Sequence, residues 1–123
     1  MADLHQFWLD QSAYDLETAE AMLKSARYLY VLFCCQQAVE KKLKALAMKR
    51  TNAFPPRLHQ LPRLAEAAGC AIDEQQSDFL RELSSYYVQS RYPEEIAAMG
   101  KDVDLQLADD ILKKTREVLQ CLQ

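Results

Sequence analysis

Apolar positions recur at helical spacing along almost the whole chain. From residue 3 to about residue 27 they lie three and four apart, and Asp3 supplies an N-cap. Residues 28–49 are apolar nearly all round in their first half, which indicates a helix with neighbours on several sides. The sequence contains no strand-like alternation, no glycine-rich phosphate loop and no internal repeat. This pattern predicts an all-α protein organised around the helix at 28–49.

A loop and a short helix follow this central helix. Two adjacent prolines within residues 50–62 lack amide hydrogens and keep the residues before them out of helical dihedrals. Pro62 suits the first turn of a short helix at 61–68, and Gly69 can end that helix in a left-handed conformation. We therefore expect one substantial loop before the short helix.

Two longer helices complete the predicted bundle. Asp73 can cap a helix that we expect to end near Gln89, because Pro93 forbids its continuation. Residues 94–104 then form a connection, and apolar positions from about residue 102 onward predict the last helix. The predicted architecture is an up-and-down bundle of four long helices plus one short helix.

Length and charge narrow the classes of function. The 123 residues, half of them hydrophobic and 27% charged, are enough for one domain that buries its own core, so we expect a single helical domain over residues 1–123. The net charge of −3 argues against the broad basic field of non-specific nucleic-acid binders. Any phosphate site must therefore be local, and nothing in the sequence signals DNA specifically.

The sequence gives no membrane signal. No stretch reaches the roughly 18 apolar residues of a membrane span. The first ten residues carry acids where a signal peptide needs a basic start and an uninterrupted apolar run. We therefore expect a cytoplasmic protein.

The four cysteines do not have the spacing of a metal site. They are Cys34, Cys35, Cys70 and Cys121, with no C-x-x-C pair among them. The adjacent Cys34 and Cys35 project about 100° apart on a helix, and His5 and His59 are the only histidines. We therefore expect thiols that are structural or incidental, with no metal ligands and no cofactor.

A polar stripe runs along the otherwise apolar helix at 28–49. Gln37, Glu40, Lys41 and Lys44 lie three, four and seven residues apart, which places them on one face. One interpretation is a solvent-exposed face with a Glu40–Lys44 ion pair between successive turns. The alternative is a functional stripe that faces a cleft.

His59 and Arg91 are the other candidates for chemistry. His59 follows the stiff double-proline loop, so its imidazole can be presented toward the bundle with little freedom to lose, although a structural role is the alternative. Neither histidine has the neighbours of a nucleophilic triad. We place Arg91 at a helix C-terminus, where the helix dipole favours a cation. Alternatively, Arg91 between Tyr87 and Tyr92 forms a fork for phosphate with a ring for base stacking.

Four segments together resemble the HEPN domain, a family named for its occurrence in higher eukaryotes and prokaryotes and for proposed nucleotide binding. They are "FWLDQSAYDLETAEAML", "CCQQAVEKKLKAL", "LHQLPRL" and "YYVQSRYPEE", and they span most of the chain. The resemblance implies a small helical bundle that dimerises. It also implies a prokaryotic, toxin–antitoxin-like setting in which a stand-alone HEPN protein accompanies a minimal nucleotidyltransferase.

This sequence departs from the nuclease motif of that family. Many relatives are metal-independent ribonucleases or toxins in which a histidine follows an arginine by four to six residues. After Arg91 the chain reads "YPEEIAA", without a histidine. Whether the protein is an enzyme, and through which catalytic residues, therefore stays open at this stage. The alternative acid or base is His59, brought to Arg91 by the fold.

The resemblance implies a candidate nucleotide- or phosphate-binding cleft made of Glu40, Lys41, Lys44, His59, Tyr87, Arg91 and Tyr92. We expect Arg91 and Lys44 to share one anion-binding pocket there. The leading hypothesis is a homodimeric, non-catalytic or weakly catalytic protein that binds nucleotide or RNA phosphate and assists a nucleotidyltransferase. The alternatives are a ribonuclease, and a helical interaction module that associates through Phe7, Trp8 and Tyr14.

Overall fold

Helices make up all the regular structure of residues 3–88 and 91–122, the part of the chain that the computed structural model describes. The helices are α1 (Leu4–Lys24), α2 (Tyr28–Thr51), α3 (Leu61–Ala67), α4 (Glu74–Ser84), α5 (Pro93–Gly100) and α6 (Leu105–Cys121). No strand occurs in these residues. The predicted all-α class is therefore confirmed, whereas the count of four long helices and one short helix is not.

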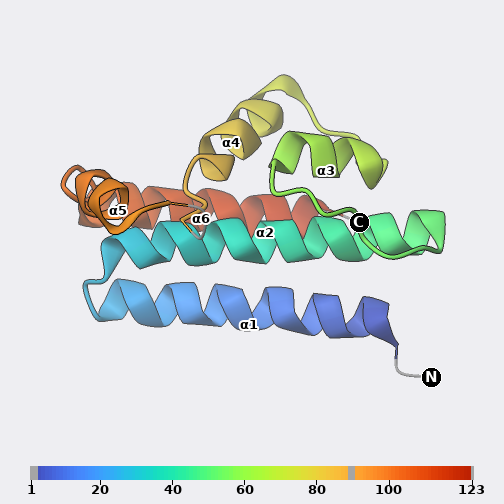
Figure 1. The fold of residues 1–123 in the computed structure, drawn as a ribbon, viewed down its shortest axis with the longest axis horizontal. Coiled ribbons are helices and arrows are strands. Elements are labelled where there is room, and N and C mark those ends of the chain that lie inside the picture. The colour runs from blue at the N-terminus through green and yellow to red at the C-terminus, as the bar shows by residue number, and fades with distance from the viewer. Residues whose placement is uncertain (1–2, 89–90, 123) are drawn as a thin grey trace.

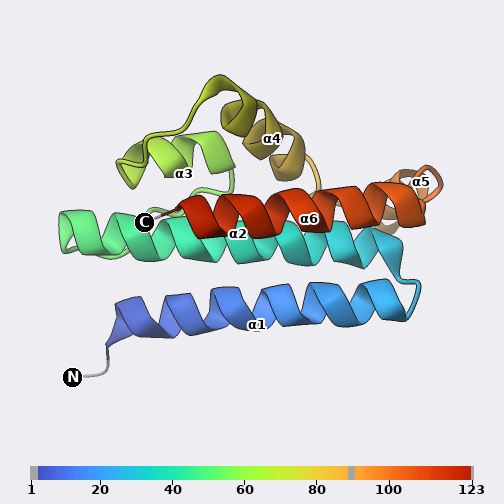
Figure 2. The ribbon, with the colours of Figure 1, turned by 180° about the vertical axis from the view of Figure 1, so that it is seen from behind.

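The three longest helices lie side by side. Figures 1 and 2 show α1 running antiparallel to α2, whereas α6 runs in the same direction as α2. The chain returns from the end of α2 to the start of α6 through α3 and α4, which cover one side, and α5, which lies at one end. The predicted up-and-down order therefore holds for α1 and α2. In place of the next long antiparallel helix, the short helices α3, α4 and α5 connect the end of α2 to the start of α6.

Helix α2 is the centre of the molecule. It contacts each of the other five helices, and Val31, Leu32 and Leu43 on it are fully buried. A helix that is apolar nearly all round its first half can satisfy those side chains only with neighbours on several sides. The position predicted for this helix is confirmed.

Local signals fix several helix ends as expected. The Asp3 carboxylate accepts a hydrogen bond from the Gln6 amide at 3.2 Å, and Asp73 forms a reciprocal capping box with Gln76. Gly69 has a φ of 70°, the left-handed conformation that follows α3. Asn52 ends α2 in the same region, with a φ of 54°.

The segment around Pro93 differs from the prediction. Helix α4 ends at Ser84, and Gln89, where its end was predicted, lies outside the described residues. Residues 94–104, predicted as a connection, lie largely in α5 and the turn after it. The reason is that Pro93 begins a helix: its missing amide hydrogen is not needed at the first position, and its fixed φ suits the first turn.

Among the described residues, no helix combines the length and the apolar character needed to cross a membrane.

Candidate functional site

The Glu40 carboxylate lies at the centre of a buried polar network. Gln36 Nε2 donates to Oε1 at 2.8 Å, and Lys44 Nζ donates to Oε2 at 3.1 Å. His59 Nδ1 lies 3.1 Å from Oε2 and 3.2 Å from Oε1. A carboxylate only accepts hydrogen bonds, so in this contact Nδ1 of His59 carries the hydrogen and donates it. Three donors thus compensate a carboxylate that is only 4% exposed.

Lys44 is also removed from solvent. Its side chain belongs to a residue that is 7% exposed, and Nζ lies 5.7 Å from the centre of the Trp8 ring. The predicted Glu40–Lys44 ion pair is present, but the solvent-exposed face predicted around it is wrong, since α1 and the loop before α3 cover both residues. Lys44 therefore neutralises Glu40 inside the protein and does not present its charge to solvent.

His59 and Tyr87 form a stacked pair on the surface. Their ring centroids are 4.3 Å apart with an interplanar angle of 17°, and the His59 side chain is 49% exposed. His59 Nε2, which bears the lone pair when Nδ1 carries the hydrogen, lies 3.4 Å from the Tyr87 hydroxyl. Burial, reinforced by the Glu40 charge, raises the pKa of Tyr87. The pair is thus an aromatic platform held by a buried carboxylate.

Arg91 does not lie at the end of a helix, contrary to the prediction, because α4 ends at Ser84. Its side chain turns back instead, with Nε donating to the Tyr87 carbonyl at 3.2 Å and Nη2 to the Ser85 carbonyl at 3.0 Å. Glu95 Oε2 lies 3.8 Å from Nη1, too far for a hydrogen bond. Within the described residues, two of the five guanidinium N–H groups therefore donate hydrogen bonds, and Nη1 faces the Glu95 carboxylate as an ion pair.

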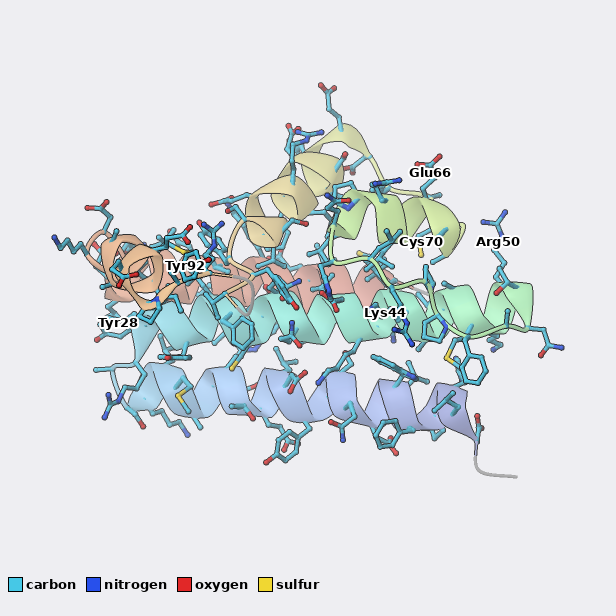
Figure 3. The ribbon with its side chains drawn as sticks, viewed as in Figure 1. Tyr28, Lys44, Arg50, Glu66, Cys70 and Tyr92 are labelled. Carbon is cyan, nitrogen blue, oxygen red and sulfur yellow. The ribbon has the colours of Figure 1, made fainter. Side chains whose placement is uncertain are left out.

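Two predicted residues lie apart from this arrangement. Lys41 Nζ pairs with Asp15 Oδ2 of α1 at 2.7 Å. Tyr92 is 72% exposed and precedes α5, where its backbone N–H donates to Glu95 Oε1 at 3.1 Å. Figure 3 shows the labelled Tyr92 beside α5, well separated along the molecule from the labelled Lys44. Neither residue contacts the Glu40 network.

The residues predicted to form one cleft therefore do not all lie together. Glu40, Lys44 and His59 are in direct contact, and His59 continues to Tyr87. Arg91 joins only through the Tyr87 backbone, so Lys44 and Arg91 are linked by a chain of contacts and form no shared anion pocket. Because Lys44 is buried, the cation of the site that solvent can reach is Arg91.

Sequence reasoning missed Gln36 and the contact of Trp8 with Lys44. Gln36 lies one turn before Glu40, as Lys44 lies one turn after it, so strict four-residue spacing on α2 was a usable signal. Gln37, selected instead, is half-buried and donates through Nε2 to Gln36 Oε1 at 2.8 Å. No sequence signal points to Trp8, because its place over Lys44 depends on how α1 packs on α2.

A cavity of about 310 Å³ opens beside Arg91. It lies where the start of α2, the turn after α4, α5 and the start of α6 meet, and Tyr86 and Asp102 also line it. The Tyr86 hydroxyl donates to Glu82 Oε2 at 3.1 Å. Burial, with the nearby Glu82 charge, raises the pKa of Tyr86 to about 12, so this hydroxyl stays protonated at neutral pH.

No cluster of three or more histidine, cysteine or acidic side chains suited to a metal ion occurs within residues 3–88 and 91–122. The described side chains thus link the His59 imidazole to the Arg91 guanidinium through Tyr87, whose ring stacks on His59 and whose carbonyl accepts from Arg91.

These features define a small helical domain with a carboxylate–histidine pair and an arginine linked to that pair through Tyr87. The HEPN domain family model matches residues 5–123, so the chain belongs to the HEPN family. The fold is similar to that of the crystal structure of TT1696 from Thermus thermophilus, with a TM-score of 0.82 over 98% of this chain and 97% of that chain. At 23% sequence identity this likeness shows the fold alone. No curated protein matches the sequence.

Proposed function

We propose that this HEPN protein binds nucleotide or RNA on the surface formed by His59, Tyr87 and Arg91. The observation that carries the proposal is the His59 imidazole, which Glu40 orients, which is 49% exposed and which stacks on Tyr87, the residue whose carbonyl accepts a hydrogen bond from Arg91. A nucleobase can stack on such a platform without sequence preference. A phosphate can accept charge-assisted hydrogen bonds from the guanidinium.

Glu40 and Lys44 position the site and do not contact the ligand. Their charges neutralise each other in the interior, and Glu40 fixes the ring orientation of His59. The accessible positive charge of the site therefore comes mainly from Arg91. We expect a weak dependence of affinity on salt, with a slope that corresponds to about one released counterion per phosphate contact.

Fluorescence anisotropy with a labelled RNA hexamer, and NMR titration with ATP, test this proposal. Arg91→Gln removes the guanidinium, and we expect it to weaken RNA binding by about tenfold or more, the loss of a charged hydrogen bond. Arg81→Gln is the matched control, because Arg81 is exposed on α4 and, among the residues that the structure describes, its side chain bonds to Asp78 and Ser77. Equal affinity of both variants, or no binding by the wild-type protein, contradicts the proposal.

A metal-independent ribonuclease is the second candidate function. It is favoured by the Glu40–His59 contact, which leaves Nε2 of the exposed ring as a proton acceptor. In this mechanism Nε2 takes the proton of a ribose 2′-hydroxyl, whose oxygen attacks the phosphorus. The 5′-oxygen leaves and takes a proton from water, which gives a 2′,3′-cyclic phosphate and a 5′-hydroxyl. Arg91 stabilises the charge on the phosphate oxygens. RNA cleavage in EDTA that is abolished in His59→Ala supports it, and cleavage retained in that variant excludes it.

We further propose that the protein is a homodimer in which α1 takes part. Phe7 and Tyr14 are 54% and 64% exposed and lie seven residues apart, on one side of α1. Trp8, by contrast, is half-buried over Lys44. Sedimentation equilibrium tests the dimer: we expect Phe7→Lys with Tyr14→Lys to give a monomer, whereas a monomeric wild-type protein at micromolar concentration contradicts the proposal.

A minimal nucleotidyltransferase is the proposed partner, in a toxin–antitoxin-like pair in the cytoplasm. The support for it is membership of the HEPN family together with the absence of a complete nuclease motif after Arg91. The test is to look for a minimal nucleotidyltransferase encoded beside this chain and to co-express the two proteins. Co-purification in a fixed ratio supports the pairing, and separate elution of the two proteins contradicts it.

A further inference from the structure

Arg91 lies between two surfaces of different character. On one side its Nε is bonded to the backbone of Tyr87, whose ring stacks on His59. On the other side the arginine lines the cavity of about 310 Å³. Two backbone carbonyls hold this guanidinium between the aromatic platform and the cavity. A phosphate bonded to the guanidinium can therefore carry one nucleoside toward the platform and another toward the cavity.

The cavity has the composition of a small-molecule site. Its walls are mostly apolar side chains from α2, α5, α6 and the turn before α6, namely Leu29, Met99, Leu107 and Val103. The ring of Tyr86 adds a flat surface, and the charged groups that line the cavity are Arg91 and Asp102. A volume of about 310 Å³ is at the lower end of the range for ligand pockets, which suits one nucleotide unit.

Asp102 supplies the selective group. It follows α5, is exposed, and has no hydrogen bond or ion pair with any described residue. A carboxylate accepts hydrogen bonds from the exocyclic amino groups of adenine, cytosine and guanine. Uracil presents a carbonyl on each side of its single ring N–H, and a carboxylate repels those carbonyls.

We propose that this cavity holds one base that carries an amino group, bonded to Asp102, while the adjacent phosphate lies on Arg91 and the next base stacks on His59. This inference rests on the proposed function and makes it narrower. The ligand is then single-stranded RNA of at least two nucleotides, and a free mononucleotide fills only part of the site. Adenine, cytosine and guanine are favoured over uracil at the cavity.

Anisotropy with labelled hexamers of adenylate, cytidylate and uridylate at one fixed salt concentration tests the inference. We expect the wild-type protein to bind the adenylate and cytidylate hexamers about tenfold or more tightly than the uridylate hexamer, within the usual discrimination of a paired base edge. Asp102→Ala should remove this difference. Glu94→Ala, which removes one exposed acid of α5 outside the cavity, should keep it.

A second variant fills the cavity. Met99→Trp, with thermal unfolding followed by circular dichroism to confirm folding, should lower adenylate-hexamer affinity about tenfold, and unchanged affinity in this variant contradicts the use of the cavity. Equal affinities of the wild-type protein for all three hexamers, with Arg91→Gln still weakening each, overturn the inference and leave the proposed function intact. No RNA binding at all by the wild-type protein overturns both.

Discussion

His59 Nδ1 lies 3.1 Å from Glu40 Oε2, although 19 residues separate them in the chain. The contact ties the end of the double-proline loop to the middle of α2. Leu61 reinforces the attachment, since its amide donates to Ser84 Oγ of α4 at 2.7 Å. The orientation of the imidazole is therefore set by the interior of the bundle and not by the loop alone.

Replacing Glu40 should destabilise the protein more than any surface change. Glu40→Ala leaves the buried Lys44 ammonium without its partner and removes an acceptor from His59 and Gln36. Breaking a buried ion pair in this way costs about 3–5 kcal/mol in the free energy of unfolding. Urea denaturation at pH 7 measures it.

The matching controls separate the charge from the packing. The double variant Glu40→Leu with Lys44→Met removes both charges and should lose much less stability than Glu40→Ala. Asp78→Ala, which breaks the exposed pair with Arg81, should cost about 0–1 kcal/mol. Similar losses for Glu40→Ala and Asp78→Ala contradict the buried role of Glu40.

A series at His59 distinguishes stacking from proton transfer. His59→Phe keeps an aromatic ring against Tyr87 but has no ring nitrogen, so RNA affinity should stay within about threefold while any cleavage is lost. His59→Ala removes the ring and should weaken RNA binding by about 5- to 150-fold, the equivalent of 1–3 kcal/mol of stacking. Anisotropy and gel analysis of labelled RNA measure the two effects. If Phe and Ala reduce the affinity equally, the stacking role is wrong.

The two glycines of the chain should respond to alanine with opposite signs. Gly69 has a φ of 70°, and a Cβ there would lie 2.7 Å from Nη1 of Arg50, which donates to the Glu66 carbonyl at the end of α3. Figure 3 shows Arg50 on α2 and Glu66 on the neighbouring helix α3. Gly69→Ala should therefore lower the free energy of unfolding by about 1 kcal/mol or more.

Gly100 is the control within the same fold. It lies in α5, and a Cβ there would meet Leu29 Cδ2 at 3.6 Å, an ordinary contact. Gly100→Ala should raise stability by about 0.5–1 kcal/mol through helix propensity. Thermal unfolding of the two variants side by side gives both values, and a loss of stability at Gly100 equal to that at Gly69 contradicts the assignment.

Stability should fall in alkaline solution. Burial raises the pKa of Cys34 from 9.0 to about 11, that of Cys35 from 9.0 to about 12, and that of Tyr86 from 10.0 to about 12. The folded protein keeps these protons to higher pH than the unfolded chain does. Their contribution is therefore complete below pH 9 and is lost as the pH rises from about 9 toward 12.

Urea denaturation between pH 7 and pH 11 under reducing conditions measures this fall. Cys35→Ala removes the thiol whose pKa burial raises to about 12, so the stability of this variant should decline less over the same range. A decline of the same size in the wild-type protein and in Cys35→Ala contradicts the assignment to Cys35.

Most of the fold follows from local patterns. Helical spacing placed α1, α2 and α6, and the caps at Asp3 and Asp73 placed the starts of α1 and α4, because amphipathic periodicity and side-chain capping are local properties. The sequence interpretation missed α5 because it took Pro93 only as a stop signal. The same residue is equally suited to start a helix, and the choice depends on the chain that follows it.

The site was predictable in part. Spacing on α2 placed Glu40 and Lys44 on one face, but a spacing pattern cannot show whether α1 covers that face. The place of Arg91 depended on where α4 ends, and its bonds to the Tyr87 and Ser85 carbonyls are tertiary choices that no sequence rule specifies. The cavity beside it needs four segments of the chain at once.

The cavity and the platform of His59 and Tyr87 are both contacted by residues of one continuous helix, α2. Leu29 lines the cavity, Phe33 lies 6.4 Å from the Tyr87 ring, and Glu40 holds His59. A single residue inserted into α2 between Phe33 and Glu40 would turn everything beyond it by about 100° relative to the cavity. Insertions in the loop before His59 leave that register unchanged. We therefore expect changes of length to be tolerated in this loop, whereas within α2 they would separate Glu40 from the cavity side of the site.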